Sequence, residues 1–335
     1  MNEGTAYRPS VRTIRAFRLW GFVWPLLVTV LAACSGSSSH DGGTTTSGHW
    51  DKLPDMPAAR SYVGVAAIGD RVFVLGGSLG TDAAAFDTKA QTWQTLEPLS
   101  SGFYMPNVAA VGDRLFVVGA RQNPNVLTYD DQGHWVQRTP MPFPDGRGAA
   151  AVGVWGTKII LAGGIIPGLS NNGLNTGVRK VDVVAYDTMS DTWQTLAPMT
   201  EARGYSMGAV IGDRFWVIGG STNDERTAAV QVLDLASGAW MDEKPLDYTL
   251  SSAAVALLDG RMYLIGGVMS AVGTISQATL LFQTDTGAAT ELAPMLTPRF
   301  ACGGAALNGH IYVAGGIMAS AMNFEPTAIF DVFTP

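Results

Sequence analysis

Cysteine and histidine are scarce in this chain, which has two cysteines and four histidines among 335 residues. Neither residue occurs at the spacings that mark zinc sites, and the sequence has no glycine-rich phosphate loop and no EF-hand series. A serine nucleophile would lack a plausible histidine base. We therefore expect no metal and no cofactor. Cys302 lies in an apolar, glycine-rich run and is interpreted as a small buried residue.

Charged residues are also few, at 15% of the chain, and the net charge of −7 is acidic. An acidic chain lacks the basic surface that sequence-independent nucleic-acid binding requires, so no nucleic-acid partner is expected. Hydrophobic residues make up 47% of the chain, and there are 40 glycines. This composition is typical of a turn-rich β protein and argues against disorder.

An apolar run near the start of the chain is too short to span a bilayer comfortably. It lies within residues 1–33, after three closely spaced arginines, and ends at the string LAAC, whose cysteine is Cys34. A basic segment followed by a short apolar run is typical of a secretory signal, and LAAC resembles the lipobox of bacterial lipoproteins. The resemblance implies cleavage before Cys34 and a lipid on that cysteine. It also implies sorting to the outer membrane of a two-membrane bacterium, because Ser35 follows. A plain anchor helix is the alternative.

The segment 34–48 is rich in serine, glycine and threonine. This composition predicts a flexible tether. We therefore expect the chain to be exported and held at the bacterial cell envelope by its lipid, with the folded domain over residues 49–335. If Cys34 carries lipid, no disulfide can form, and the hydrophobic core must hold the domain together.

A run of β-branched or aromatic residues that ends on small residues returns six times, first as RVFVLGG and last as HIYVAGG. The first small residue of each pair is Gly76, Gly119, Gly163, Gly219, Gly266 or Gly315, at intervals of 43, 44, 56, 47 and 49 residues. Each unit reads as four short strands separated by turn residues. Such repeats predict the blades of a β-propeller.

Three recurring features together resemble the kelch family across nearly all of residues 49–335: the small pair, an aspartate after an apolar or aromatic residue in the third strand, and a tryptophan in the fourth. The aspartates are Asp87, Asp130, Asp187, Asp234 and Asp331, and the tryptophans are Trp93, Trp135, Trp193 and Trp240. We interpret the aspartates as turn-capping residues and the tryptophans as rings that fill the space between neighbouring blades. Two units depart from the pattern, with Ala120 for the second glycine and Ala289 for the tryptophan.

The two ends of the repeat region complement each other. The sixth unit stops after its third strand, whereas residues 49–57 form a fourth strand without the other three. Joining them removes two exposed strand edges. The sequence therefore predicts an all-β fold, a six-bladed kelch-type β-propeller closed by an N-terminal outer strand that completes the last blade. Trp50 is expected to pack in that blade.

Arginine is frequent at one repeat position, sixteen residues before the first small residue of each unit. The position holds Arg60, Phe103, Arg147, Arg203, Leu250 and Arg299, and the aromatic residues Tyr62, Tyr104, Tyr205 and Phe300 lie beside it. A ring of guanidinium groups at a channel mouth would attract an anion and bind a carboxylate or phosphate in a bidentate manner. The resembling kelch domains of eukaryotic adaptor proteins use this face for acidic peptides. The alternative is that these arginines pair with nearby carboxylates such as Asp145 and Glu201.

These patterns predict a non-catalytic binding module for an anionic ligand, either an acidic peptide or a sugar acid. Two alternatives remain open. Exported kelch proteins of the sialic-acid mutarotase/epimerase group need only a carboxylate base and cationic groups, and Glu201 and Glu225 are the candidates for that base. The other alternative is a scaffold subunit of an envelope protein complex. A kelch-type copper oxidase site is not expected, because no pair of histidines converges.

A second set of mostly basic residues starts the second strand of each unit, on the face opposite the arginine position. Its members are Arg71, Arg114, Lys158, Arg214, Arg261 and His310. Charged side chains at strand ends are usually exposed. We interpret them as solvated rim charges.

Overall fold

Short antiparallel strands make up most of the computed structural model, which describes residues 47–168, 177–270, 273–319 and 324–335. In most of the repeats the second strand is almost fully buried, as in Arg71–Leu75, because other strands and sheets cover both of its faces. The predicted signal segment, Cys34 and residues 35–46 of the predicted tether lie outside the described residues. None of the helices among the described residues is long and apolar enough to cross a bilayer.

Six four-stranded antiparallel sheets lie within these residues, and we number them in chain order. The first contains β2 (Gly64–Ile68), β3 (Arg71–Leu75), β4 (Ala83–Asp87) and β5 (Thr92–Thr95), and the second contains β6 (Val108–Val111), β7 (Arg114–Ala120), β8 (Asn123–Tyr129) and β9 (Trp135–Arg138). The third contains β10 (Ala151–Trp155), β11 (Lys158–Ala162), β14 (Val183–Asp187) and β15 (Thr192–Leu196), and the fourth contains β16 (Met207–Ile211), β17 (Arg214–Ile218), β18 (Val230–Asp234) and β19 (Trp240–Glu243). The fifth contains β21 (Ala254–Leu258), β22 (Arg261–Ile265), β25 (Thr279–Phe282) and β26 (Ala289–Glu291), and the sixth contains β27 (Gly303–Leu307), β28 (His310–Ala314), β31 (Phe330–Thr334) and β1 (His49–Lys52).

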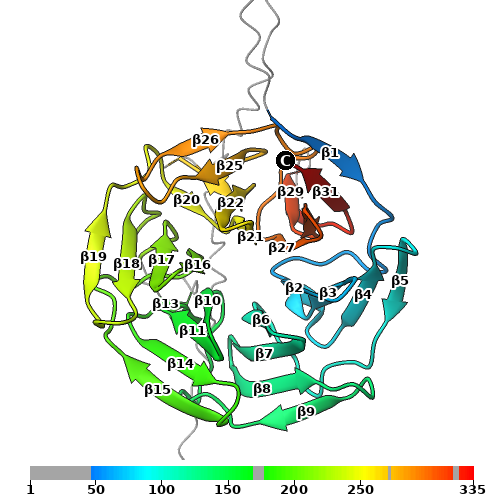
Figure 1. Ribbon diagram of the computed structural model, residues 1–335, viewed down its shortest axis with the longest axis horizontal. Helices are drawn as coiled ribbons and strands as arrows, with labels where there is room; N and C mark the ends of the chain where they lie inside the picture. The colour runs from blue at the N-terminus through cyan, green and yellow to red at the C-terminus, as the bar shows by residue number, and fades with distance from the viewer. Residues whose placement is uncertain (1–46, 169–176, 271–272, 320–323) are drawn as a thin grey trace, which may run out of the picture. The chain divides into compact units, whose positions relative to one another are not determined.

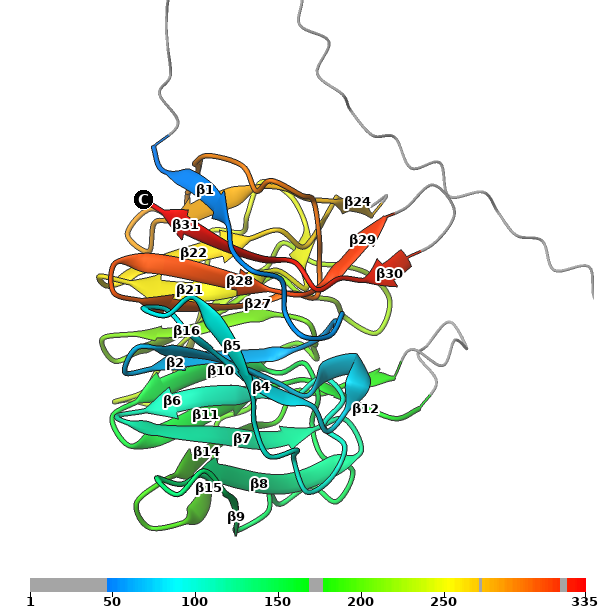
Figure 2. The same cartoon turned by 90° about the vertical axis from the view of Figure 1, so that its right-hand side faces the viewer.

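Smaller elements lie outside these sheets, and all except β20 follow a second strand. They are the 3-10 helix η1 (Gly77–Leu79), the pair β12 (Ile165–Ile166) and β13 (Val178–Arg179), the trio β20 (Leu250–Ser251), β23 (Val268–Met269) and β24 (Thr274–Ile275), and the pair β29 (Ile317–Ala319) and β30 (Phe324–Pro326). Figure 2 shows β12, β24, β29 and β30 on the side away from the hairpin turns that join first and second strands. We call their side the connection face and the other side, which carries turns such as Gly69–Asp70, the turn face.

The first strand of each sheet is innermost, and these strands lie around a common centre (Figure 1). They contact one another in the order β2, β6, β10, β16, β21 and β27, and β27 also contacts β2. At the periphery, β1 pairs antiparallel with β31, with Trp50 opposite Phe333. The first and last described strands of the chain therefore belong to one sheet.

Tryptophans seal the outer ends of five junctions between sheets. Each indole donates a hydrogen bond to a backbone carbonyl of the preceding sheet's outer segment. The pairs are Trp93 with Pro54, Trp135 with Glu97, Trp193 with Thr139, Trp240 with Ala197, and Trp50 with Ala293, at 2.8–3.1 Å. Each ring also packs in or against an apolar cluster that draws on two sheets. The expectation that tryptophans fill these spaces is confirmed.

The paired glycines bring neighbouring sheets into contact through their backbones. A Cβ atom on Gly266, whose φ is +67°, would lie 2.4 Å from the carbonyl oxygen of Arg299 in the next sheet. The amide of Gly267 donates to that same oxygen at 3.0 Å. Equivalent bonds run from Gly77 to Phe103, from Gly164 to Arg203, from Gly220 to Leu250 and from Gly316 to Arg60.

Ala120 replaces the second glycine in the second sheet, and a buried asparagine takes over the missing contact. The Asn107 amide donates to the carbonyl of Arg147 at 2.6 Å and to that of Val118 at 3.0 Å. Its side-chain oxygen accepts from the amide of Ala150 at 3.1 Å. The departure at Ala120 is therefore compensated by a side chain rather than left unpaired.

Four of the five repeated aspartates cap turns as expected. Asp87, Asp130, Asp187 and Asp234 accept hydrogen bonds from backbone amides two to four residues ahead. Asp331 does not belong to this set, because it pairs with Val313 inside the sixth sheet and is 1% exposed. Thr334, at the end of β31, occupies the position that the capping aspartates occupy in the other sheets. Its hydroxyl contacts His310 at 2.9 Å.

Candidate functional site

The four repeated arginines are buried. Arg60 is 1% exposed, Arg147 5%, and Arg203 and Arg299 0%. The structure therefore corrects the expectation that their guanidinium groups ring a channel mouth. Phe103, at the same repeat position, is also 0% exposed and packs in the core between the first and second sheets.

These arginines hydrogen-bond within their own sheets, near the connection face. Arg60 donates to the carbonyl of Asp82 at 3.0 Å, and Arg203 donates to that of Ala229 at 2.9 Å. Burial lowers the pKa of both side chains, and nearby carboxylates oppose that shift. Because arginine remains charged in proteins, each guanidinium acts here as a fixed donor that ties strands together.

The other two make short ion pairs with residues of the same sheet. Arg299 Nη1 lies 2.7 Å from Asp331 Oδ2, with both side chains almost fully buried. Arg147 Nη2 lies 2.7 Å from Asp182 Oδ2, and its guanidinium stacks 4.1 Å from the ring centre of Phe143. The alternative interpretation, pairing with carboxylates, thus holds for them, although the partner of Arg147 is Asp182 rather than Asp145. Glu201 lies 4.0 Å from Arg203 Nε and is about half exposed, with 48% of its side chain accessible.

A ring of left-handed residues lies two positions after each repeated arginine position. It consists of Tyr62, Met105, Ala149, Tyr205, Ser252 and Ala301, with φ values between +50° and +57°. Backbone bonds of 2.7–3.2 Å link Tyr62 to Ala301, Ala301 to Ser252, Ser252 to Tyr205, Tyr205 to Ala149, and Ala149 to Met105. Such conformations cost about 1–3 kcal/mol each when the residue is not glycine. The linked backbones therefore impose this geometry at the throat, a cavity of about 150 Å³ that these six residues line.

Three tyrosines meet above the throat. The ring of Tyr62 lies 5.8 Å from that of Tyr104 and 6.0 Å from that of Tyr205. Burial raises the pKa of all three phenols above the ordinary value, so they are neutral donors at physiological pH. The sequence prediction that these three residues share one face is supported by this contact, whereas Phe300 lies against Phe324 at 6.2 Å.

Two arginines that the sequence analysis missed lie beside the tyrosines. Arg179 is 5.8 Å from the ring centre of Tyr205, and its guanidinium donates to Ser221 Oγ at 3.1 Å and to the carbonyl of Gly177 at 2.9 Å. Arg121 follows the small pair of the second sheet, where the other sheets have serine, isoleucine or valine. A Cβ atom on Gly177 would lie 3.7 Å from Arg121 Nη2, and the carbonyl of the same glycine accepts from Arg179, so both guanidiniums lie close to Gly177. The sequence signal that could have identified Arg121 is therefore a departure from the repeat pattern, not a residue that recurs in every repeat.

A pocket of about 310 Å³ opens on the connection face beside this group. Its lining combines aromatic, hydroxyl, amide and charged residues, including Tyr62, Tyr205, Phe300, Arg179, Asn223 and Glu225. Glu225 is exposed there, whereas Glu201 is not part of the lining. We call Tyr62, Tyr104, Tyr205, Arg121 and Arg179 the mouth cluster.

The mouth cluster can bind an anion and stack a planar or apolar ring, and it places a carboxylate nearby. Within the described ranges, no group of three or more histidine, cysteine, aspartate or glutamate side chains comes together in a way that could hold a metal ion. Cys302 is buried, and burial raises the pKa of its thiol, which disfavours the thiolate form.

Comparisons with known proteins give kelch-repeat relatives at modest identity. The chain is 25% identical to Beta-scruin of Limulus polyphemus over 72% of this chain and 23% of that protein, and 26% identical to Kelch-like protein 36 of Mus musculus over 72% of this chain and 41% of that protein. It is 24% identical to Kelch-like protein terF of Aspergillus terreus over 70% of this chain and 56% of that protein. The chain thus spans less than two thirds of the length of these relatives. No family model matches it.

One solved structure, described as "Structure of YjhT", aligns with a TM-score of 0.69 at 16% identity, covering 84% of this chain and 97% of that one. At that identity the likeness concerns the fold alone. The four-stranded antiparallel sheets, the near absence of helix and the kelch-repeat relatives fit a β-propeller.

Proposed function

We propose that this chain is a six-bladed kelch-type β-propeller, closed by β1 as the outer strand of its last blade. We further propose that it is a non-catalytic binding module that holds an anionic ligand at the mouth cluster. One observation carries the second proposal. Arg179 lines a pocket together with Tyr205, and Arg121 lies close to Gly177, whose carbonyl accepts from Arg179.

Neighbouring guanidinium groups repel each other, and that repulsion is relieved when an anion binds between them. The Arg121 side chain makes no hydrogen bond or ion pair with the described residues, and its Nε atom is buried without a partner. An unpaired buried donor is costly, so a ligand that accepts from it gains more than an exposed contact would provide. Arg121 is therefore the residue on which affinity should depend most.

The ligand class is an acidic peptide or a sugar acid. Kelch-repeat propellers in general serve as protein-interaction modules, which supports the peptide. The hydroxyl and amide groups of Ser221, Thr222 and Asn223 in the same pocket could hydrogen-bond sugar hydroxyls, and the tyrosine rings could stack on either ligand. Both classes share the carboxylate that two arginines would bind.

A stability screen tests this function. N-acetylneuraminic acid and a peptide of six alternating aspartates and glutamates would each be titrated, and a bound ligand at a hundredfold its Kd raises stability by roughly 2.7 kcal/mol. Arg121→Ala should weaken binding by roughly tenfold to a hundredfold, because a hydrogen bond to a charged group is lost. Arg261→Ala, an exposed arginine on the turn face, is the control. If neither probe binds, or if the two variants behave alike, the proposal fails.

A sialic-acid mutarotase/epimerase is the second candidate, and the position of Glu225 in the pocket lining favours it. Only a carboxylate base and cationic groups would be required. Glu225→Gln should then abolish anomer exchange of N-acetylneuraminic acid while binding persists. Glu201→Gln is the matched control, because Glu201 lies outside the pocket. A scaffold subunit would instead retain its protein partner in both variants and in Arg121→Ala.

We also propose that the binding module is a lipoprotein of the bacterial envelope, anchored through Cys34 and carried on the tether 34–48. The LAAC string at the end of the signal segment supports this. Several acyl chains on one cysteine give stable membrane attachment, since each buried CH₂ contributes about 0.8 kcal/mol. Cys34→Ser should move the full chain from the membrane pellet to the soluble fraction, and a variant that still pellets would contradict the anchor.

A further inference from the structure

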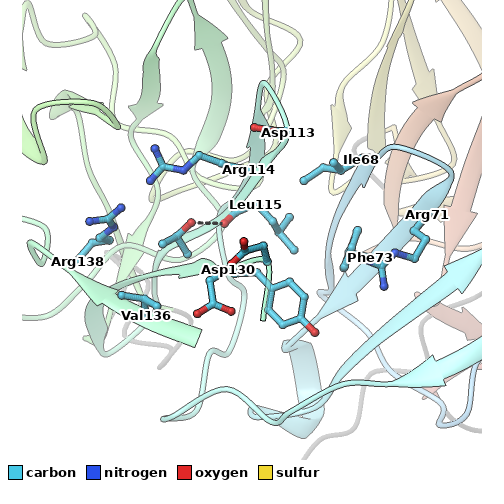
Figure 3. Close-up of a pocket in the computed structure, with 12 residues that line it drawn as sticks. Ile68, Arg71, Phe73, Asp113, Arg114, Leu115, Asp130, Val136 and Arg138 are labelled. Carbon is cyan, nitrogen blue, oxygen red and sulfur yellow. Dashed lines mark hydrogen bonds between the residues drawn. The ribbon is translucent and has the colours of Figure 1, made fainter. Parts of the chain in front are cut away.

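A second hollow lies on the turn face, at the ends of β7 and β8, and encloses about 550 Å³. Figure 3 shows Arg114 and Arg138 to one side of Leu115, and Arg71 with Phe73 to the other. Its lining therefore combines three arginines with apolar side chains from the first and second sheets. It shares no residue with the mouth cluster.

Two of these arginines are stacked on aromatic rings. The guanidinium carbon of Arg71 lies 5.1 Å from the ring centre of Phe73, and that of Arg114 lies 5.1 Å from the ring centre of Phe116. A stacked guanidinium keeps its in-plane N–H donors available for a carboxylate. Neither side chain makes a hydrogen bond or ion pair with the described residues.

Arg138 adds a third cation with unused donors. Its Nε atom is buried and has no hydrogen-bond partner within the described part of the chain. The nearby carboxylate of Asp191 accepts from the Tyr186 hydroxyl and the Thr139 amide, and Arg138 attracts it electrostatically without a hydrogen bond. The described residues therefore provide no hydrogen-bond acceptor for the three guanidiniums of the hollow.

The equivalent residues in other sheets differ. Lys158 donates to Gln194 at 3.4 Å, and His310 contacts Thr334 at 2.9 Å. Arg214 and Arg261 are exposed, whereas Arg71 and Arg114 are half-buried. The interpretation as solvated rim charges thus fits the fourth and fifth sheets but not the first and second.

The hydroxyl of Tyr129, at this hollow, makes no hydrogen bond with the described residues. The matching tyrosine of the third sheet, Tyr186, donates to Asp191, but the turn after Tyr129 is one residue shorter. Gly133 takes the place of that aspartate, and a Cβ atom there would lie 3.4 Å from the Tyr129 hydroxyl. The shorter turn therefore removes the carboxylate that the Tyr186 hydroxyl uses, and the described residues offer the Tyr129 hydroxyl no replacement.

The hollow also contains three aspartates, and their negative charges bear on whether its ligand is an anion or a cation. Asp130 Oδ1 accepts from the amides of Gln132 and His134, so that oxygen is committed to the turn. Asp113 and Asp131 are exposed turn residues whose carboxylates can remain in water. All three aspartates line the hollow together with the arginines, which are half-buried.

We propose that this turn-face hollow is a second binding site, for an acidic peptide segment that carries an apolar side chain between its carboxylates. The arginines lie on both sides of Leu115 (Figure 3), an arrangement that suits a ligand with more than one carboxylate. The floor is apolar, formed by Ile68, Phe73, Leu115 and Val136, so a purely anionic polymer would leave it uncovered. An extended peptide with acidic residues around a leucine or phenylalanine satisfies both features.

The site can be tested with a fluorescein-labelled peptide, Glu-Glu-Leu-Phe-Glu-Glu, by fluorescence anisotropy on the whole chain. Arg114→Ala and Arg138→Ala should each weaken binding roughly tenfold, because each removes hydrogen bonds to a charged group. Arg214→Ala and Arg261→Ala are matched controls at equivalent but exposed positions and should leave Kd unchanged. Arg114→Gln, which keeps the side-chain volume, covers the case in which an alanine variant is poorly folded.

Four results would overturn this proposal. Absence of saturable binding would do so, as would equal weakening by Arg214→Ala, which would indicate general attraction to basic residues. Loss of binding in Arg121→Ala would assign the peptide to the mouth cluster instead. Displacement of the peptide by millimolar inorganic phosphate would show a small-anion site. Because Arg121→Ala separates the two surfaces, failure here leaves the proposed function intact, and the reverse also holds.

Discussion

Two groups of arginines occupy the connection face and do different things. Arg60, Arg203 and Arg299 recur at one repeat position, are at most 1% exposed, and tie strands within a sheet. Arg121 and Arg179 occur outside that position, and Arg179 lines a pocket together with Tyr205. In this molecule the arginines that recur at the same position of each repeat stabilise the sheets themselves. Residues that interrupt the repeat are where a specific ligand site can form.

The comparison predicts that mutations in the buried group lower the free energy of unfolding, whereas mutations in the mouth cluster leave it almost unchanged. The loss of stability in the buried group is the largest effect that we expect. Arg299→Ala leaves Asp331, which is 1% exposed, without its partner at 2.7 Å. Removing one member of a buried ion pair costs about 3–5 kcal/mol. Urea denaturation would measure the loss, whereas Arg121→Ala should change stability by less than about 0.5 kcal/mol.

A double replacement sharpens this test. Changing Arg299→Met together with Asp331→Leu removes both charges and keeps apolar volume, so most of the lost stability should return. If the single Arg299→Ala variant were as stable as the wild type, the buried arginines would not be structural, and the contrast with the mouth cluster would disappear.

Asn107 should show an intermediate effect, because it replaces a backbone contact that the other sheets make with glycine. Asn107→Ala leaves the carbonyl of Arg147 and the amide of Ala150 unpaired. Each unsatisfied buried group costs about 1–3 kcal/mol, and we expect a total of about 2–3 kcal/mol in denaturant unfolding. Asn125→Ala is the control, since Asn125 is half-buried and its side-chain amide bonds only to Ser101 within the described residues. Similar costs for both variants would contradict this role.

The sequence predicted the repeated strands because alternating patterns, turns and glycine pairs are local signals. It also placed Tyr62, Tyr104 and Tyr205 on one face correctly, since each lies one or two residues after the repeated arginine position. It misassigned the arginines because burial depends on the neighbouring sheet, which the spacing alone does not describe. Asp331 was misaligned for a similar reason. Strand β31 continues to Thr334, so the pairing register, rather than the match of letters, decides which residue caps the turn.

Arg179 and the compensation by Asn107 could not be read from the repeat. Arg179 reaches Tyr205 from the pair β12 and β13, which belongs to a long insertion in the third unit. Asn107 contacts Arg147 across forty positions of the chain. Both contacts join residues that are far apart in the sequence. An arginine or an asparagine at these positions is also not unusual enough to indicate such a contact.

The smallest change in stability is expected in the fifth sheet. Its outer strand has Ala289 where the other sheets have tryptophan. Ala289 pairs with Phe282, as Trp93 pairs with Phe86 and Trp240 with Leu233. The carbonyl of Lys244, which precedes Pro245, stands where the acceptors of the other indoles stand. Ala289→Trp should therefore add one hydrogen bond and buried apolar area, and raise stability by about 1 kcal/mol in denaturant unfolding. Ala289→Leu adds area without a donor and should gain less. A loss of stability would mean that neighbouring side chains, Tyr248 among them, already fill this junction, so that the fifth sheet is sealed by other means.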